Sequence, residues 1–415
     1  MSIGNMNREG DDKAQETQNS DEVIKIKPKL ITDFNPERRK LALSYTRISR
    51  RYSFGLMVIS FIVSLIVLIL KITVELRNLI SEYISEDPFI LVGIFFIIGF
   101  LIVNIVELPI SFYLHSRLSR RYGLSRLTNF RWLRRFIKAS FIGFFISFPL
   151  FEGFYWLLRN FPDTWWLWST IILVFFTVIL TNLAPILLLP RFYKFDPLED
   201  KYPDLAEDLI KMSHDTGVKV TSAFVWQLGE IATVSNAALL GMGNTRRIIV
   251  ADTMLENYTT EEIKWVLAHE LGHHKHHDLW KGIILGTMTT FIIFFFTHFT
   301  FLPLANFFGY STDIADIGSF PILGLSFWLI SEIFINVPSL WYSRRVEQRT
   351  DAFASSLIPE VPIIKSLFIK MADQNLSDID PPWWEKYFFM SHPPISERIR
   401  YAEERGNSKI NTMDV

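Results

Sequence analysis

Six long apolar segments constrain the fold of this chain more than any other feature. Each has about the 20 predominantly apolar residues that a helix needs to cross the hydrocarbon core of a bilayer. A backbone in that core must satisfy its own hydrogen bonds, which favours helices. The segments cover approximately residues 53–76, 88–114, 139–158, 166–190, 280–303 and 318–341. We therefore expect a mainly α, polytopic membrane protein with about six transmembrane helices.

The charges that flank these segments predict how the chain is oriented in the membrane. The stretch "RRKLALSYTRISRR" and the loop 116–138 are strongly basic, whereas alternate loops such as "SEYISEDP" are acidic or neutral. Positive residues concentrate in cytoplasmic loops. We therefore expect both termini and residues 191–279 and 342–415 to face the cytoplasm, at the plasma membrane if the host is prokaryotic.

The polar regions between and beyond these segments suggest a division into five parts. Residues 1–30 have few apolar side chains to bury, which predicts a disordered tail. A basic segment with four transmembrane helices is expected in 31–190, and a transmembrane hairpin in 280–341. The two other parts, 191–279 and 342–415, are expected to be the two halves of a cytoplasmic α+β domain.

Overall composition excludes several kinds of function. Lys and Arg number 42 and Asp and Glu 43, so the chain has no basic excess that would favour nucleic acid as a partner. It contains no cysteine. Disulfides, thiolate metal ligands and a cysteine nucleophile are therefore excluded.

Residues 191–279 show local patterns of helices and strands. An amphipathic stretch predicts a helix that ends near Gly217. "TSAFVWQL" predicts one strand, and "SNAALLGMGNTRRIIVAD" predicts two strands joined by a Gly/Asn turn. Thr259 and Glu262 fit a capping box at the start of a further helix.

That further helix contains the sequence "HELGH". His269 and His273 are four residues apart, so both project from one face of a helix. Two neutral imidazoles at this spacing can bind one Zn²⁺. Glu270 lies between them, in the position of the general base of a metalloprotease. This pattern predicts a zincin-like catalytic domain.

A third ligand can come from either of two places. His276 lies about two turns beyond His269, which is too far along a straight helix for an easy fit. Glu347 follows the sixth apolar segment, and a helical hairpin through the membrane would return it to the level of the two histidines. We therefore favour Glu347 over His276. His274, His276 and His277 are expected to be solvated, and Asp278 is expected to help end the helix.

At this point the sequence resembles a known family. "HELGH", "SRRVEQRTDAFA" and "SHPPISER", in this order, resemble the type I CAAX prenyl proteases, which are integral-membrane zinc metalloproteases. The resemblance extends from about Asp33 to Arg405. It implies one zinc ion per chain, with His269, His273 and Glu347 as its ligands.

The resemblance also implies further site residues. Asp351 would orient a ligand histidine through a hydrogen bond. Glu270 would be the catalytic base, and His392 and Arg398 would stabilise the substrate carbonyl as it becomes an oxyanion. The stretch "SNAA" matches an edge strand that pairs with substrate, which makes Asn236 and Ala237 candidate substrate-binding residues.

The expected function is therefore zinc-dependent endopeptidase activity at the cytoplasmic face of a membrane. The substrates would be peptides or membrane proteins, and the lipid bilayer would be the other partner. An HtpX-like quality-control protease is one alternative. A metal transporter or channel with a His-rich mouth is another, but only His298 lies within an apolar segment. The aromatic stretch 381–389 could contact the membrane interface or pack within the cytoplasmic domain.

Overall fold

The computed structural model describes residues 28–241 and 243–413 of the chain. The predicted disordered tail, residues 1–30, therefore lies almost wholly outside the described residues. The rest is mainly α-helical, as predicted, and contains one small sheet.

Five helical stretches among the described residues are long and apolar enough to cross a membrane. They are Pro36–Ile69, Pro88–Arg121, Asn129–Asn160, Trp165–Phe192 and Asp278–Phe308. The elements in and beside them are α1 (Pro36–Ile69), α2 (Ile72–Tyr83), α3 (Pro88–Ser111), η1 (Phe112–Leu118), α4 (Ser119–Arg121), α5 (Asn129–Asn160), α6 (Trp165–Leu183), η2 (Ala184–Leu188), α7 (Leu189–Phe192) and α11 (Asp278–Phe308). Each stretch corresponds to one of the predicted apolar segments, although α1 begins and ends earlier than residues 53–76 suggested.

The sixth predicted segment, residues 318–341, is helical and contains a π-helical turn. Its apolar part, Ile317–Ser331, is shorter than the other five helices. It consists of η4 (Ile317–Ser319) and α12 (Phe320–Ser331), and a π-helical turn, η5 (Glu332–Asn336), connects it to α13 (Val337–Leu357). Asn336 Nδ2 donates to Glu332 Oε2 within that turn. Glu332 and Asn336 are polar residues that directly follow the apolar part, and the prediction that residues 318–341 form a sixth transmembrane helix stays a prediction.

The three π-helical segments of the described chain all lie close to a proline. Pro109 precedes η1, Pro185 lies in η2, and Pro338 follows η5. Proline removes a backbone donor from a helix and clashes with the preceding turn. Neighbouring residues then shift their hydrogen bonds to partners farther along, which widens the helix locally. The positions of these π-helical segments therefore follow the prolines in the sequence.

A four-stranded sheet adjoins one end of the helices. Its strands are β1 (Phe195–Pro197), β2 (Ser222–Trp226), β3 (Ala237–Leu240) and β4 (Arg247–Ala251), in the order β1-β2-β4-β3. β2 and β4 are parallel, and the other two pairs are antiparallel. The three predicted strands are confirmed, and β1 was not anticipated. β3 is an edge strand, a position that lets a further strand pair with it.

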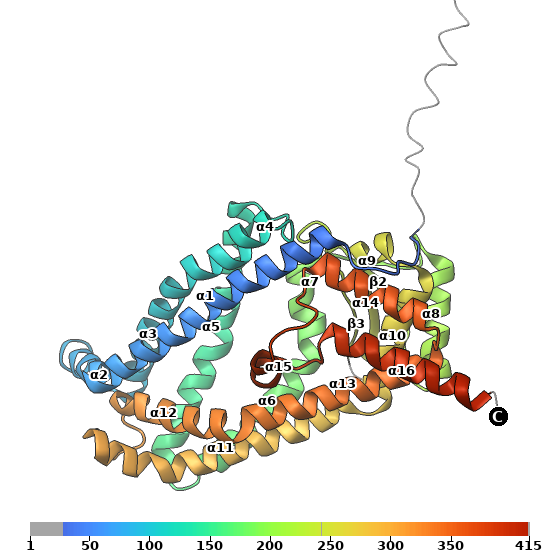
Figure 1. The fold of residues 1–415 in the computed structure, drawn as a ribbon. Helices are drawn as coiled ribbons and strands as arrows, with labels where there is room; N and C mark the ends of the chain where they lie inside the picture. Colours follow the sequence, from blue (N-terminus) through green and yellow to red (C-terminus); the bar gives the residue numbers. More distant parts are fainter. Residues whose placement is uncertain (1–27, 242, 414–415) are drawn as a thin grey trace, which may run out of the picture.

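The helices that pack on this sheet come from two distant parts of the chain. They are α8 (Pro203–Asp215), α9 (Asp252–Asn257), α10 (Thr260–Lys275), α14 (Val361–Asn375) and α16 (Ile395–Met413), with α15 (Trp383–Phe389) and η3 (Gly243–Thr245) in connecting loops. One buried core joins residues of both parts, including Leu267 and Leu271 with Leu367. We call the sheet with α8, α9, α10, α14 and α16 the sheet unit; it lies at the right of Figure 1.

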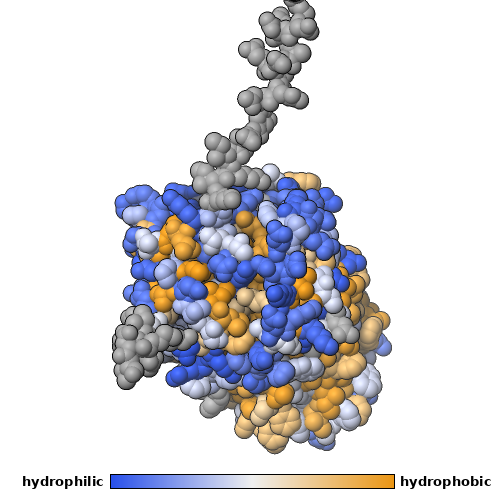
Figure 2. All heavy atoms as spheres, turned by 90° about the vertical axis from the view of Figure 1, so that its right-hand side faces the viewer, coloured by the Kyte–Doolittle hydropathy of each residue, from blue (hydrophilic) through white to orange (hydrophobic). Residues whose placement is uncertain are grey.

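Local signals position the helices of the sheet unit as predicted. The Thr259 side chain accepts from the Glu262 backbone, and Glu262 accepts from the Thr259 backbone, which completes the capping box. α8 ends just before Gly217, whose φ of 80° suits a residue without a side chain. Figure 2 shows that the surface at this end is largely hydrophilic.

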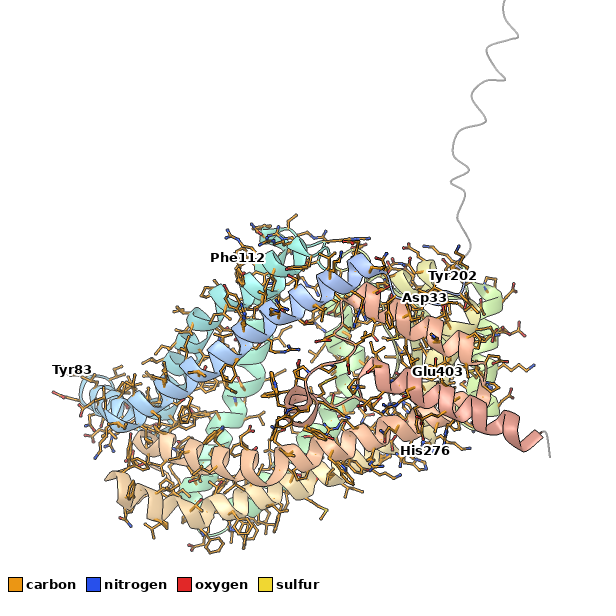
Figure 3. The ribbon with its side chains drawn as sticks, in the orientation of Figure 1. Asp33, Tyr83, Phe112, Tyr202, His276 and Glu403 are labelled. Carbon is orange, nitrogen blue, oxygen red and sulfur yellow. The ribbon has the colours of Figure 1, made fainter. Side chains whose placement is uncertain are left out.

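A second buried core closes the molecule at the opposite end. Tyr155, Leu158, Trp165 and Ile322 are fully buried there, between helices of the apolar bundle. We call α2 and the turn 309–319 the distal end. Figure 3 places Tyr83, at the end of α2, far from the sheet unit.

Candidate active site

α10 and α13 pack closely because of a glycine in the "HELGH" sequence. A Cβ atom at Gly272 would lie 2.8 Å from Thr350 Cγ2 and 3.0 Å from Phe353 Cδ1. Real Cβ atoms essentially never lie as close as 2.8 Å to another carbon, so any other residue would force the Thr350 side chain or α13 to shift. The glycine therefore allows Glu347, one turn earlier on α13, to reach the two histidines of α10.

These three side chains form a compact group. His269 Nε2 lies 3.3 Å from Glu347 Oε2, and His273 Nε2 lies 3.5 Å from Glu347 Oε1. One ligand atom from each residue lies within 4.8 Å of the others, and this is the group of the described chain that could hold a metal ion. Glu347 Oε2 is buried, and the polar atom that faces it at 3.3 Å is His269 Nε2.

This donor set fits a zinc ion. Two imidazoles and one carboxylate are the three protein ligands of a common type of catalytic zinc site, which leaves one position open. A buried carboxylate oxygen without a donor is costly unless a cation or a hydrogen bond compensates it. The preferred third ligand, Glu347, is therefore where the hairpin argument expected it. His276 instead packs its ring edge-on against Phe353.

Asp351 and Arg398 support the first histidine. His269 Nδ1 lies 2.9 Å from Asp351 Oδ1, and Arg398 donates to both oxygens of that carboxylate, at 2.8 and 2.6 Å. Burial opposes the charge on Asp351, but Arg398 and His269 hold the pKa of its carboxyl far below the usual range. Burial also opposes protonation of His269, but Asp351 and Glu347 raise its pKa to about 9. Arg398 thus reaches the group through Asp351.

Asp278 contacts the second histidine, His273, and the sequence analysis did not predict this contact. Its Oδ2 atom lies 3.1 Å from His273 Nδ1, and its Oδ1 atom accepts from Arg349. We expected Asp278 to help end the helix, but α10 ends at Lys275 and Asp278 begins α11. His277 separates the two helices with a φ of 56°. An Asp at a helix start looks like ordinary capping, so the sequence carried no signal for this contact.

The edge strand β3 lies against α10. The backbone of Leu239 interacts with two α10 side chains: it hydrogen-bonds Glu270, and its carbonyl lies 3.4 Å from His274 Nε2. His274 is therefore half-buried against the strand, not solvated as expected. Burial raises the pKa of Glu270 above its ordinary value, against the influence of His269 and His273.

The backbone of Ala237 points away from the sheet. The Asn236 carbonyl accepts from Ala251 on β4, and successive residues of an antiparallel strand alternate between facing the partner and facing outward. Leu239 faces outward towards α10, so Ala237, two residues earlier, also faces outward. The side chain of Asn236 is exposed. The two candidate substrate-binding residues therefore lie at the open edge.

His392 approaches the group from a C-terminal loop. Its Nε2 atom lies 3.3 Å from Glu347 Oε1, and its Nδ1 atom lies 2.8 Å from Ser391 Oγ. The His392 side chain is exposed, but partial desolvation of its ring lowers its pKa, although Glu347 opposes this effect. The preceding helix α15 is held on both sides: Arg50 of α1 pairs with Glu385, and Arg344 of α13 donates to the carbonyls of residues 386 and 390. The aromatic stretch thus bridges two helices.

The fold and this site define a multi-pass membrane protein whose water-facing unit carries a His-Glu-x-x-His metal site. Residues 21–194 match the family profile "CAAX prenyl protease N-terminal, five membrane helices", and residues 199–406 match "Peptidase family M48". The chain belongs to peptidase family M48 and is a membrane metalloprotease.

Several known proteins are similar to it. An uncharacterized metalloprotease of Bacillus subtilis is 28% identical over 76% of this chain and 74% of its own length. CAAX prenyl protease 1 of Saccharomyces cerevisiae is 28% identical over 74% of this chain and 71% of its own length. The crystal structure of S. mikatae Ste24p has the same fold, with a TM-score of 0.80 at 22% identity, and the match covers 91% of this chain and 92% of that one.

Proposed function

We propose that the protein is a zinc-dependent endopeptidase that cleaves peptides or membrane proteins on the cytoplasmic side of the membrane. The observation that carries this proposal is the group formed by His269, His273 and Glu347, with Glu270 beside it. The group lies on α10 and α13, outside the five long apolar helices. This position favours a protease over a transporter, which would need ligands along its spans.

His269, His273 and Glu347 would hold one zinc ion. When bound, zinc polarises a peptide carbonyl and makes water acidic enough to lose a proton near neutral pH. Glu270 would accept that proton and pass it to the leaving amine. Its raised pKa suits this role, because the carboxyl then both accepts and returns a proton near the working pH.

Edge strand β3 would bind the substrate backbone. A peptide that adds to this edge can pair with the outward-facing backbone of Ala237, and its side chains can contact Asn236. The strand is tied to Glu270 through Leu239, so a peptide bound there lies beside the base. Backbone pairing is largely independent of side chains, so residues elsewhere would decide which peptides are cleaved.

His392 and Arg398 would have different roles. His392 has an exposed side chain and lies 3.3 Å from Glu347, so it can donate to a substrate carbonyl as negative charge develops. Arg398 is largely buried and donates twice to Asp351. We assign Arg398 a positioning role, because it keeps Asp351 ionised and Asp351 holds His269.

Two observations support placement of the sheet unit on the cytoplasmic side. The basic segments contact this unit directly: Arg38 donates to the carbonyls of residues 373 and 374 on α14, and Arg126 donates to the carbonyl of Gly229. The acidic loop after Tyr83 lies at the opposite end (Figure 3). Basic segments face the cytoplasm in most membrane proteins.

The decisive experiment compares detergent-purified wild type with Glu270→Gln on a quenched-fluorescent peptide library, with the zinc content of each measured. We expect about one zinc ion in both, and loss of about 100- to 10,000-fold in cleavage rate in the variant, since general bases contribute that much. Protein that holds no zinc and cannot be loaded with it would rule the proposal out. The cleaved peptides would begin to define the substrate, including whether a prenyl group matters.

A second experiment tests substrate pairing at β3. Ala237→Pro removes an outward-facing N–H and no hydrogen bond of the sheet, so we expect higher KM for all peptides, by about 2- to 10-fold, with less loss of stability than a proline that breaks the ladder. Ala238→Pro is the matched control, because Ala238 faces β4 and should lose stability instead. Unchanged KM in Ala237→Pro would exclude backbone pairing at this residue.

A further inference from the structure

His273 has its own support, formed by residues from two other helices. Asp278 Oδ2 lies 3.1 Å from His273 Nδ1, and Arg349 of α13 donates to the other oxygen of Asp278. Arg349 lies two residues after Glu347 on the same helix. One small set of contacts therefore connects α10, α11 and α13 around one imidazole.

This set parallels the one around His269. In both, an aspartate faces the Nδ1 atom of the histidine, and an arginine neutralises that aspartate. The two sets differ in origin: Asp351 lies far along the chain from His269, whereas Asp278 is five residues from His273. The Asp278 side chain is only 9% exposed, so its charge requires the partners that it has.

The link between α10 and α11 makes the contact with Asp278 possible. α10 ends at Lys275, and His277 adopts the left-handed conformation, with a φ of 56°. This turn starts α11 at Asp278 and directs its carboxylate back towards His273. A non-glycine residue in this conformation is strained, and such strain persists only where the surrounding contacts outweigh it.

We propose that Asp278 is a positioning residue that fixes the tautomer and orientation of His273, with Arg349 holding the Asp278 carboxylate in place. A proton held on Nδ1 by Asp278 leaves the lone pair of Nε2 directed towards Glu347, which lies 3.5 Å away. Asp278 is the first residue of the membrane helix α11. The position at which α11 starts would therefore affect how tightly His273 holds the metal. This inference rests on the proposed zinc site.

The test measures zinc affinity by competition with a chelator, in full-length detergent-purified protein that carries Glu270→Gln to prevent self-cleavage. Loss of an outer partner of a metal ligand typically weakens binding by about 10- to 100-fold. We expect Asp278→Ala to weaken zinc binding by about that much, and Asp278→Asn by less, because its amide oxygen still accepts from Nδ1. Arg349→Met should fall between Asp278→Asn and the parent.

Matched controls separate this role from a purely structural one. Glu37→Gln removes an exposed carboxylate far from the site, and we expect the affinity of the parent. Cobalt-substituted protein adds a direct readout, because an altered ligand geometry changes the visible absorption of Co²⁺, whereas a change in overall stability does not. An altered spectrum in Asp278→Ala, and none in Glu37→Gln, is the expected result.

A second pair of variants keeps the proposal testable if Asp278→Ala does not fold. His277→Gly preserves the left-handed turn without strain and should retain the zinc affinity of the parent. His277→Val disfavours that turn and should lower the affinity. Parent-like affinity in Asp278→Asn, Asp278→Ala and His277→Val would overturn the inference and leave the proposed function intact. A parent protein that binds no zinc would instead overturn the proposed function.

Discussion

The sheet unit and the distal end are held together by different kinds of polar contact. In the sheet unit, fully or largely buried charges join helices that are far apart in the sequence, as in the pair Glu262–Lys370 at 2.6 Å. At the distal end, most polar contacts involve backbone carbonyls: Thr73 donates to Gly318, and Tyr310 donates to Leu68. Its ion pair, Arg77–Asp316 at 3.2 Å, is partly exposed.

The difference follows from what each end has to do. A metal site needs side chains from several helices in one geometry, and buried charges with specific partners impose such a geometry because any misplacement leaves a charge unpaired. The distal end links α1 to α3 and α11 to α12, and turns with backbone acceptors suffice for such links. We therefore expect substitutions in the sheet unit to have larger effects than those at the distal end.

The largest effect on stability is expected for Glu262→Gln. Glu262 is fully buried and accepts from Ser366, Lys370 and the backbone of Thr259. The variant would leave Lys370 without its anion, which costs about 3–5 kcal/mol. Thermal unfolding in detergent measures this loss. The control is Glu261→Gln. Glu261 is half-exposed and pairs with Lys264, so this variant should stay within about 1 kcal/mol of wild type. Equal losses of stability in the two variants would show that burial does not set the strength of these contacts.

A smaller effect, on activity, is expected for Arg398→Met. Arg398 lowers the pKa of Asp351 against the effect of burial, so its removal raises that pKa. Asp351 accepts from His269 most strongly as a carboxylate, so activity on the acidic side would fall at a higher pH than in wild type. Near neutral pH, kcat/KM should drop by about 10- to 100-fold. A pH profile of kcat/KM measures both, and a uniform decrease with no shift of the acidic limb would contradict this assignment.

The smallest effect is expected for Arg77→Met at the distal end. The Arg77 side chain is 32% exposed, and the largely buried Asp316 side chain keeps the Gly318 N–H as a donor when Arg77 is lost, so we expect a loss of only about 1 kcal/mol. Thermal unfolding should shift slightly, and peptide cleavage should be unchanged. Loss of cleavage at wild-type stability would show instead that the distal end is coupled to the site.

Local sequence patterns predicted much of the fold and the centre of the site. Apolar length predicted the spans, because a bilayer imposes one length on every helix that crosses it. Helical periodicity brought His269 and His273 together, and hairpin topology indicated Glu347. Hydropathy did not reveal the π-helical turn η5 beside Pro338, because an average over a segment does not report local helix geometry.

The sequence by itself therefore determined the class of this protein, its membrane helices and the residue types of its metal site. These properties depend on composition and on contacts within one helical turn. Only the tertiary structure decided that Asp278 supports His273, that Arg398 acts on Asp351, and that Ala237 faces the open edge of the sheet. Each of these contacts depends on the direction in which a side chain or backbone group points after distant helices have packed. How closely two helices pack depends in turn on the side chains between them, as at Gly272.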